Sequence, residues 1–394
     1  MDATPEKPMI SPASPPLEVA RDGKTAAGPK AARVLFVSLW ELGWKTWASQ
    51  LEHFSAQHQG LDAVHLRVSQ PRWLKALSRE LPSPIGRALV PHKRAWEWYM
   101  RRTVAPQIAA GRFDVVYISS QIMAPALIEP CRRAGARVAI TMDVTGPAYQ
   151  RDLLGQEIPA EQTWADERAI YAACDLCVPM SSWIKDSLQR DFDVPAERIL
   201  VCPPGVETAR FGGDAPTQVE GRLPHILFCV NDFERKGGPQ LVRWHQELWA
   251  GKAELHIASS GAPPLSGLRN VFRHGSVPHA HLMDEMLPSS DLFCLPTRSD
   301  MSPFAVAEAQ AAGLPTVSSR IGGLSDLVLD GQSGFLVAPD DEEGFKTAVT
   351  RLLDDPALRV RMRVEARRHA NEHLDAAKVF PRLLDGLIAL RGTS

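Results

Sequence analysis

The sequence predicts an α/β protein with two doubly wound parallel sheets, each covered by helices on both faces. Two observations indicate this class. Short apolar runs alternate with helical segments, and this alternation occurs in two series separated by a Pro-Pro-Gly break at 203–205. The length of 394 residues is also sufficient for two or more domains with substantial cores.

The first series follows residues 1–30, which are rich in Pro, Ala, Ser and Lys and lack apolar periodicity. We expect this N-terminal segment to be disordered, because it has too little apolar surface to offset the entropy of ordering. The strands expected after it lie at 32–38, 63–68, 115–118, 138–141, 176–178 and 199–201.

The second series contains equally short apolar runs and again alternates with helical segments, so we expect a second sheet of the same kind. Its strands are expected at 226–230, 255–258, 271–274, 292–295, 316–318 and 335–337. Ligands of such sheets bind beyond the carboxyl ends of the strands, which is where we expect the functional residues.

One segment of the second series, residues 299–315, combines a helix start with two carboxylates. It follows an apolar run at 291–296 that is expected to form a buried strand. We expect Ser302 to cap the helix and Pro303 to be its first residue, because the N–H that proline lacks has no helical partner there. Gly313 is expected near the helix end.

The start of this helix predicts an anion site. The amides of Phe304, Ala305 and Val306 are expected to point outward, and the helix dipole adds partial positive charge. Asp300 precedes them and Glu308 lies in the second turn. Carboxylates beside a phosphate suit hydrogen bonds from sugar or ribose hydroxyls, so we expect a sugar-nucleotide site. A capped, solvated helix with ordinary acidic residues is the alternative for this segment alone.

Four blocks in the C-terminal half extend this pattern: 201–207, 231–237, which ends in Lys-Gly, 299–315, and 321–340, which contains a glycine pair and Asp-Gly-x-x-Gly. Together they resemble the signature of the retaining glycosyltransferases of family 4, known as glycosyltransferases group 1. Asp300 and Glu308 occupy the positions of the two signature glutamates, so the first is replaced by aspartate. The resemblance covers roughly residues 165–380.

The resemblance implies the GT-B fold, in which two Rossmann-like domains face a cleft. It implies an acceptor-binding domain at 31–204, a nucleotide-sugar-binding domain at 205–378, and a C-terminal helix at 379–394 that crosses back to the first domain. The implied reaction moves a sugar from a nucleoside-diphosphate sugar to a hydroxyl of a glycan or lipid-linked acceptor, with retention. Glu308 would hold the ribose and Asp300 the donor sugar. No metal or cofactor is implied.

Arg235 and Lys236 are the expected cations of this site. They follow an apolar run, and fixed cations lower the barrier where diphosphate charge grows. Many relatives carry an arginine five or six residues before the lysine, whereas Val230 and Asn231 stand here. A solvated basic turn is the alternative.

The N-terminal half offers two further candidates. Gly43 lies after the first strand, where the family has a glycine-rich loop near the donor phosphates; a turn glycine packed among tryptophans is the alternative. The tryptophans at 40, 44 and 47 also present faces for stacking on an acceptor sugar. Asp143 ends a strand where many relatives have a histidine near the transferred sugar, and a loop-capping aspartate is the alternative.

Residues 72–102 are strongly basic and contain three tryptophans and a tyrosine. This composition favours either peripheral contact with an anionic membrane or lipid-linked phosphate, or a solvated basic helix.

The overall net charge of −2 provides no positive electrostatic field that would attract nucleic acid. Without an apolar run of about 20 residues or a signal peptide, we expect a cytoplasmic protein.

Other functions leave weaker signals. Cys174 and Cys177 have C-x-x-C spacing but no second ligand pair, so we expect buried thiols rather than a metal site. A nicotinamide-dependent oxidoreductase is disfavoured because no G-x-G-x-x-G follows an early strand. A sugar-nucleotide epimerase and a noncatalytic sugar-nucleotide-binding protein remain open.

Overall fold

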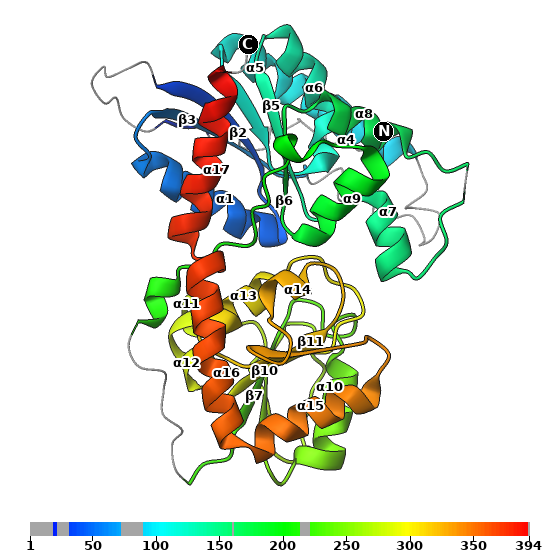
Figure 1. The fold of residues 1–394 in the computed structure, drawn as a ribbon, viewed down its shortest axis with the longest axis vertical. Coiled ribbons are helices and arrows are strands. Elements are labelled where there is room, and N and C mark those ends of the chain that lie inside the picture. The colour runs from blue at the N-terminus through cyan, green and yellow to red at the C-terminus, as the bar shows by residue number, and fades with distance from the viewer. Residues whose placement is uncertain (1–18, 22–30, 72–89, 160, 213–220, 393–394) are drawn as a thin grey trace, which may run out of the picture.

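The chain folds into two α/β units stacked end to end (Figure 1). The computed structural model describes residues 19–21, 31–71, 90–159, 161–212 and 221–392. Most of the N-terminal segment expected to be disordered lies outside the described residues, as does the first part of the basic segment.

The first unit contains a six-stranded sheet of order β1-β3-β2-β4-β5-β6, parallel except for β1. Its strands are β1 (Val19–Arg21), β2 (Ala32–Leu39), β3 (Leu61–Val68), β4 (Val115–Ile118), β5 (Arg137–Met142) and β6 (Leu176–Pro179). Its helices include α1 (Leu42–Gln57), α4 (Val90–Thr103), α5 (Ala105–Gly111), α6 (Ala124–Arg133), α7 (Gly146–Ala148), α8 (Ala165–Ala173) and α9 (Ser182–Phe192).

Both faces of this sheet are buried, which explains why β2 is apolar at nearly every position. Val34 and Phe36 pack into one core with helix α1, whereas Leu35 and Val37 pack into another beneath helices α4, α5 and α6. Alternate residues of a strand point to opposite faces, so a sheet covered on both sides requires a continuous apolar run.

Two local expectations were wrong. Residues 19–21, expected to be disordered, form β1 and pair antiparallel with β3 in the register Val19↔Leu66. Because β3 would otherwise be an edge strand with unpaired backbone groups, an adjoining extended segment can complete its hydrogen bonds. Residues 199–201, expected to be a strand, contribute only an isolated bridge between Cys177 and Ile199.

The second unit contains a six-stranded, fully parallel sheet of order β12-β11-β10-β7-β8-β9. Its strands are β7 (His225–Cys229), β8 (Glu254–Ala258), β9 (Val271–Arg273), β10 (Leu292–Leu295), β11 (Thr316–Ser319) and β12 (Gly334–Val337). Its helices include α10 (Gly238–Trp244), α11 (His279–His281), α12 (Leu287–Ser289), α13 (Phe304–Ala311), α14 (Leu324–Leu327), α15 (Glu342–Asp354) and α16 (Pro356–His369). The predicted fold class is confirmed.

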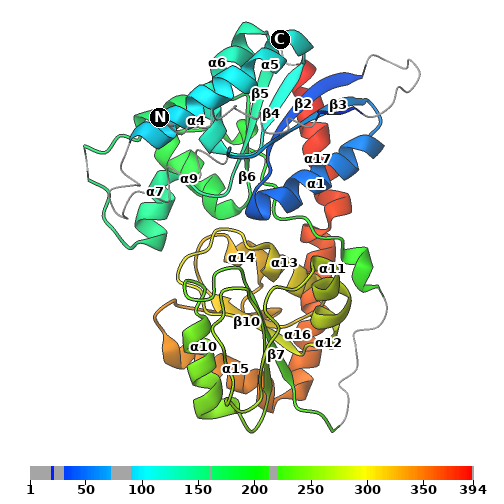
Figure 2. The same ribbon diagram turned by 180° about the vertical axis from the view of Figure 1, so that it is seen from behind.

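Two segments cross between the units side by side. Val206 donates its N–H to Leu374 at 2.8 Å, and its carbonyl accepts from Ala376 at 2.9 Å. The chain then continues as α17 (Ala376–Ala389), which packs along the first unit (Figures 1 and 2). There Phe380 stacks on Phe54 with ring centres 5.4 Å apart. The paired crossing thereby connects the last helix to the first sheet.

Candidate functional site

Residues that follow strands of the first sheet meet residues that follow strands of the second. The backbone and hydroxyl of Ser182, after β6, donate hydrogen bonds to the Asp326 carboxylate, after β11. An added Cβ on Gly323 would lie 2.7 Å from the Cβ of Ser181. The carboxyl ends of two parallel sheets therefore face each other, which is the ligand-binding edge of such sheets.

The helix at the centre of this junction, α13, begins one residue later than the sequence indicated. Pro303 is its N-cap with extended backbone, and no side chain caps the helix. The prediction of a Ser302 cap is therefore wrong. The Ser302 hydroxyl is buried and has no hydrogen-bond partner among the described residues. It faces Gly323 instead, whose added Cβ would lie 2.6 Å from it.

The three amides expected to face an anion are not equivalent. Val306 donates its N–H to the Pro303 carbonyl at 3.1 Å, so this amide is already used inside the first turn. The amides of Phe304 and Ala305 are the earlier donors of the helix start, where backbone N–H groups lack an intrahelical partner. Anion binding at this helix start would rest on these two.

A glycine turn supports the loop before α13. Gly323 donates its N–H to the Met301 carbonyl at 2.6 Å. Gly322 has φ of +53°, and an added Cβ would lie 2.3 Å from the Asp300 carbonyl oxygen. Only glycine fits this approach and this backbone conformation. The glycine pair seen in the sequence therefore positions the loop that carries Asp300.

Lys236 and Asp300 form an ion pair. Their side chains are 13% and 9% exposed, so the pair is largely buried. Burial lowers the pKa of Lys236, while the charge of Asp300 and the hydrogen bond to it oppose that change. Gly237 follows with φ of +86°, and an added Cβ would lie 2.2 Å from the Pro296 carbonyl oxygen. The Lys-Gly pair thus places an ammonium against the loop after β10.

Arg235 also turns toward this loop. Its Nε donates to Asp232 at 3.1 Å, and its guanidinium donates to the backbone carbonyl of Ser299. The guanidinium is about half exposed. Arg235 therefore lies beside the Lys236–Asp300 pair but has its own acceptors.

Asp143 comes from the other unit, directly after β5. Burial is the main cause that raises its pKa to about 6; a hydrogen bond with its own backbone opposes this rise, and the charge of Asp300 contributes to it. The two carboxylates therefore interact across the junction. A carboxyl group that titrates near neutral pH in such a place can hold or release a proton.

Glu308 lies in the second turn of α13 and is buried. Its Oε1 accepts a hydrogen bond from His279 Nε2 at 2.8 Å, and this bond raises the pKa of His279. His279 was not identified from the sequence. It belongs to the short helix α11, far from Glu308 along the chain, and no local motif marks it.

Gly43 lies inside α1 rather than in a loop, at the second helical position. An added Cβ would lie 3.8 Å from the Phe304 ring, so the start of α1 faces the start of α13.

The expectation that the tryptophan at 47 stacks on an acceptor sugar is wrong. Trp47 is fully buried and donates to the Tyr117 hydroxyl at 2.8 Å, because its helix face covers the first sheet.

The described part of the basic segment contains α4. Trp96 and Tyr99 are buried in the core between the first sheet and helices α4, α5 and α6. Trp98 is instead 58% exposed, and the Arg102 guanidinium lies 5.8 Å from its ring centre. Trp73 lies outside the described residues. Among the described residues, none of the helices is both long and apolar enough to span a membrane.

Cys174 and Cys177 are free thiols in buried positions. Burial raises the pKa of both, to about 12 for Cys177. A raised pKa keeps a thiol protonated and unreactive at neutral pH, since the thiolate is the nucleophile and metal ligand.

Two Rossmann-like units facing each other at their strand ends define the GT-B class of glycosyltransferases. Solved structures agree on the fold. Sucrose-phosphate synthase from Thermosynechococcus elongatus superposes with a TM-score of 0.69 at 17% identity, covering 92% of this chain and 100% of that one. The E. coli trehalose-6-phosphate protein bound with UDP-2-fluoro glucose superposes with a TM-score of 0.66 at 13% identity, with the same coverage.

Sequence comparison gives the family. The profile described as Glycosyltransferase Family 4 matches residues 62–210, and that described as Glycosyl transferases group 1 matches 224–355. The chain belongs to this family, glycosyltransferase family 4 of group 1, which confirms the resemblance seen in the motifs.

Curated relatives include D-inositol 3-phosphate glycosyltransferase 1 of Catenulispora acidiphila, which is 28% identical over an alignment of 290 residues; the match covers 66% of this chain and 69% of the relative. A GDP-mannose-dependent alpha-(1-6)-phosphatidylinositol monomannoside mannosyltransferase of Mycolicibacterium smegmatis is 27% identical over 66% of this chain and 73% of its own. The chain thus spans about two thirds of the length of such relatives.

Proposed function

We propose that this glycosyltransferase moves a sugar from a nucleoside-diphosphate sugar to a hydroxyl of a glycan or lipid-linked acceptor, with retention at the anomeric carbon. One observation carries the proposal. The Lys236–Asp300 pair of the second unit lies beside the start of α13, and the charge of Asp300 acts on the Asp143 carboxyl of the first unit. A carboxyl group, an ammonium group and helix amides in one place match the charges of a nucleotide-sugar donor.

The donor is held mainly by the second unit in this proposal. The Phe304 and Ala305 amides and the α13 dipole bind a phosphate oxygen. The Glu308 carboxylate accepts hydrogen bonds from the ribose hydroxyls, with His279 positioning it at 2.8 Å. Asp300 accepts from hydroxyls of the donor sugar.

Lys236 stabilises the leaving group. As the bond between the anomeric carbon and the phosphate oxygen breaks, the electron pair goes to the diphosphate, and the ammonium lies where that charge grows. Arg235 adds a second positive charge nearby. Because fixed cations and a helix start supply this stabilisation, the proposed reaction needs no metal ion.

The acceptor enters from the side of the first unit. Its hydroxyl oxygen bonds to the anomeric carbon on the face that the phosphate leaves, and its proton passes to the departing phosphate oxygen. Asp143, with a pKa near 6, accepts a hydrogen bond from the acceptor or sugar hydroxyls. No enzymatic nucleophile is required for retention in this scheme.

The test begins with the donor. One relative is named as GDP-mannose-dependent, and solved neighbours were determined with UDP or a UDP-sugar. A thermal-shift panel of UDP-, GDP-, ADP- and dTDP-sugars is therefore expected to show stabilisation by one base. With that donor, nucleoside diphosphate should be released only when an acceptor is present, and NMR of the product should show the donor's anomeric configuration.

Other outcomes identify other functions. Interconversion of donor sugars without an acceptor would indicate an epimerase. Donor binding without turnover across a broad acceptor panel would indicate a noncatalytic binding protein. An inverted product would contradict retention but leave sugar transfer intact.

We also propose that the exposed part of the basic segment contacts an anionic membrane that carries a lipid-linked acceptor. Trp98 and Arg102 lie together on the exposed face of α4, and Arg101 beside them is also exposed. Interfacial aromatic and basic side chains suit such a surface. Sedimentation with anionic vesicles at low salt should pull down the protein; absence of binding would contradict the proposal.

A further inference from the structure

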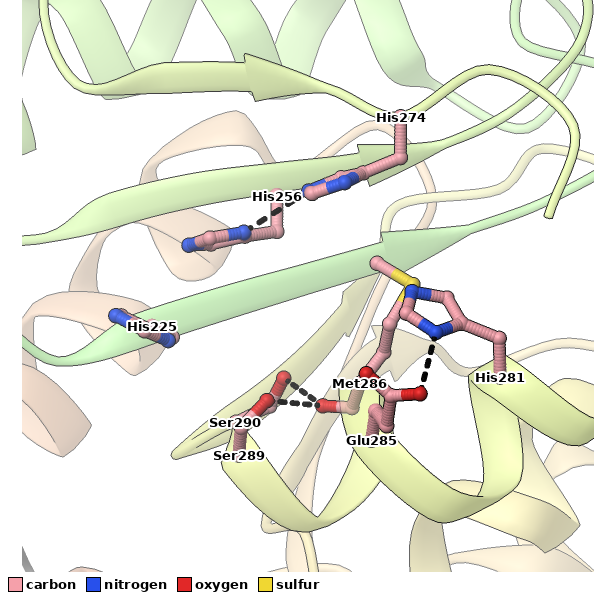
Figure 3. A pocket seen from close by; sticks show the side chains of 8 residues that line it. All are labelled: His225, His256, His274, His281, Glu285, Met286, Ser289 and Ser290. Atoms are coloured by element: carbon pink, nitrogen blue, oxygen red, sulfur yellow. Dashed lines mark hydrogen bonds and ion pairs between the residues drawn. The ribbon is translucent and has the colours of Figure 1, made fainter.

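A row of histidines crosses the second sheet at some distance from the candidate site. His225 is the first residue of β7, His256 is the central residue of β8, and His274 follows β9. Glu254 opens β8 directly opposite His225 in the parallel register. Since alternate residues of a strand share a face, Glu254 and His256 project to the same side. Figure 3 shows the three imidazoles side by side over the sheet.

The carboxylate of Glu254 bridges two of these imidazoles. Its Oε2 lies 3.0 Å from His225 Nε2 and 3.2 Å from His256 Nε2. The three ligand atoms all lie within 4.8 Å of one another. In a tetrahedral site with bonds of about 2.0–2.1 Å, ligand atoms are about 3.3 Å apart. Small side-chain rotations would therefore bring all three to one metal ion.

A further histidine orients one of the proposed ligands, His256. His256 Nδ1 lies 3.0 Å from His274 Nε2, so a metal on Nε2 leaves Nδ1 to carry the proton and donate it to His274. Metal-binding histidines characteristically donate their second ring N–H in this way, which fixes the tautomer and the ring orientation.

The structure also leaves space beside the histidines. A cavity of about 190 Å³ lies between the sheet and the helical segment of His281, Glu285 and Met286 (Figure 3). His225 and His256 line this cavity, so a water molecule or small ligand has room beside the two imidazoles.

One neighbouring positive charge, that of Arg222, would repel a metal cation at this site, but an adjacent carboxylate neutralises it. Arg222 is close enough to lower the pKa of both His225 and His256. Its guanidinium donates to the Asp291 carboxylate at 2.7 Å, so that carboxylate balances its charge. Glu254 then supplies negative charge to the site itself.

We propose that His225, Glu254 and His256 bind one transition-metal ion of the zinc class, with His274 positioning His256. Two imidazoles and one carboxylate suit Zn²⁺, Co²⁺, Ni²⁺ or Cu²⁺, whereas Mg²⁺ and Ca²⁺ prefer oxygen ligands. Because His225 and Glu254 begin their strands while the sugar-nucleotide candidates follow strand ends, this site is separate from the proposed transfer reaction. A bound ion would join β7 to β8.

The experiment titrates the full, untagged chain with ZnCl₂ by calorimetry and with Co²⁺ by visible absorption. We expect one ion per chain, a Co²⁺ spectrum typical of four-coordination, and no comparable uptake of Mg²⁺. Glu254→Gln, which preserves side-chain shape, and His256→Ala should each weaken binding at least about tenfold. His274→Phe should weaken it about 10- to 100-fold, the usual range for orienting partners.

His373→Ala is the matched control, because His373 is an exposed histidine beside Glu372 outside the cluster. It should bind as the unchanged chain does. Circular dichroism of each metal-free variant checks folding, and Glu254→Gln remains the deciding variant if His256→Ala unfolds. Equal affinity in Glu254→Gln, His256→Ala and His373→Ala would overturn the site, as would no binding by the unchanged chain.

Discussion

The two units contribute to the candidate site in different ways. In the second unit the main candidate side chains are already paired within the unit: Lys236 with Asp300, and Glu308 with His279. Asp143 in the first unit instead feels the Asp300 charge of the other unit, and burial leaves its pKa near 6. Under the proposed function, this comparison corresponds to a preorganised donor side and an acceptor side that is completed only when the units meet.

The sharpest way to break this comparison is to remove the central cation. Lys236→Ala should reduce kcat by about 10²–10³-fold, because it removes charge stabilisation of the leaving diphosphate. It also leaves Asp300 buried without its partner, which lowers stability. Lys252→Ala is the control, since Lys252 forms an exposed pair with Asp354. Near-normal kcat in folded Lys236→Ala would remove Lys236 from the mechanism.

A second change tests whether the donor side depends on its backbone fit. Gly237→Ala should lower the free energy of unfolding by more than about 2 kcal/mol, because φ of +86° is unfavourable for alanine and its Cβ would meet the Pro296 carbonyl. Thermal and urea unfolding would measure the loss.

Gly135→Ala is the control that separates the backbone strain of a positive φ from the steric clash expected in Gly237→Ala. Gly135 lies in the first unit with φ of +74° and nothing within 4 Å of an added Cβ. It should cost only about 1–2 kcal/mol. Equal losses at the two glycines would show that close packing against Pro296 is unimportant.

Asp143→Asn tests the acceptor side through pH. The folded pKa of Asp143, about 6, lies above its ordinary value of 3.8, so the unchanged protein should lose stability as pH rises from about 4 to 6. The variant should lack this loss and be more stable at pH 7 by about 1–3 kcal/mol, while kcat falls about tenfold. Urea unfolding at several pH values measures the first effect.

The control for that measurement is Asp62→Asn, because Asp62 is an exposed carboxylate of the same unit. It should leave both the pH dependence of stability and kcat unchanged. A pH dependence in Asp143→Asn equal to that of the unchanged protein would mean that another group titrates in this range.

The smallest expected effect concerns the histidine that the sequence did not reveal. His279→Ala should raise the donor KM about three- to tenfold with little change in kcat, because Glu308 loses its positioning partner. Binding assays with the matching nucleoside diphosphate should show the same loss. His53→Ala, an exposed histidine of α1, is the control, and an unchanged donor KM in His279→Ala would contradict the positioning role.

The sequence predicted the second unit in more detail than the first. The glycines at 237, 322 and 323 can be recognised in the sequence because the backbone conformation, or the close approach of neighbouring atoms, requires glycine there. Asp300 and Glu308 are readable because they have fixed places around a helix start. The Ser302 cap was mispredicted, since an extended Pro303 separates the serine from the helix.

The first unit has fewer local signals. From sequence alone, a tryptophan in an amphipathic helix can be predicted either to stack on a ligand or to pack in the core. The structure shows that Trp47 is a core residue, because it is buried against Tyr117. Similarly, β1 depends on the free edge of β3, which a pattern within 19–21 does not disclose. Such outcomes depend on neighbours distant along the chain.

By itself, the sequence determined the two-sheet α/β class, the family, and the loop-helix segment with Asp300 and Glu308, because apolar periodicity and glycine geometry act over short stretches. Only the tertiary structure decided that Lys236 pairs with Asp300, that His279 holds Glu308, and that the charge of Asp300 acts on Asp143 of the other unit. Those contacts join segments widely separated in sequence, and their charges interact strongly because folding removes them from water.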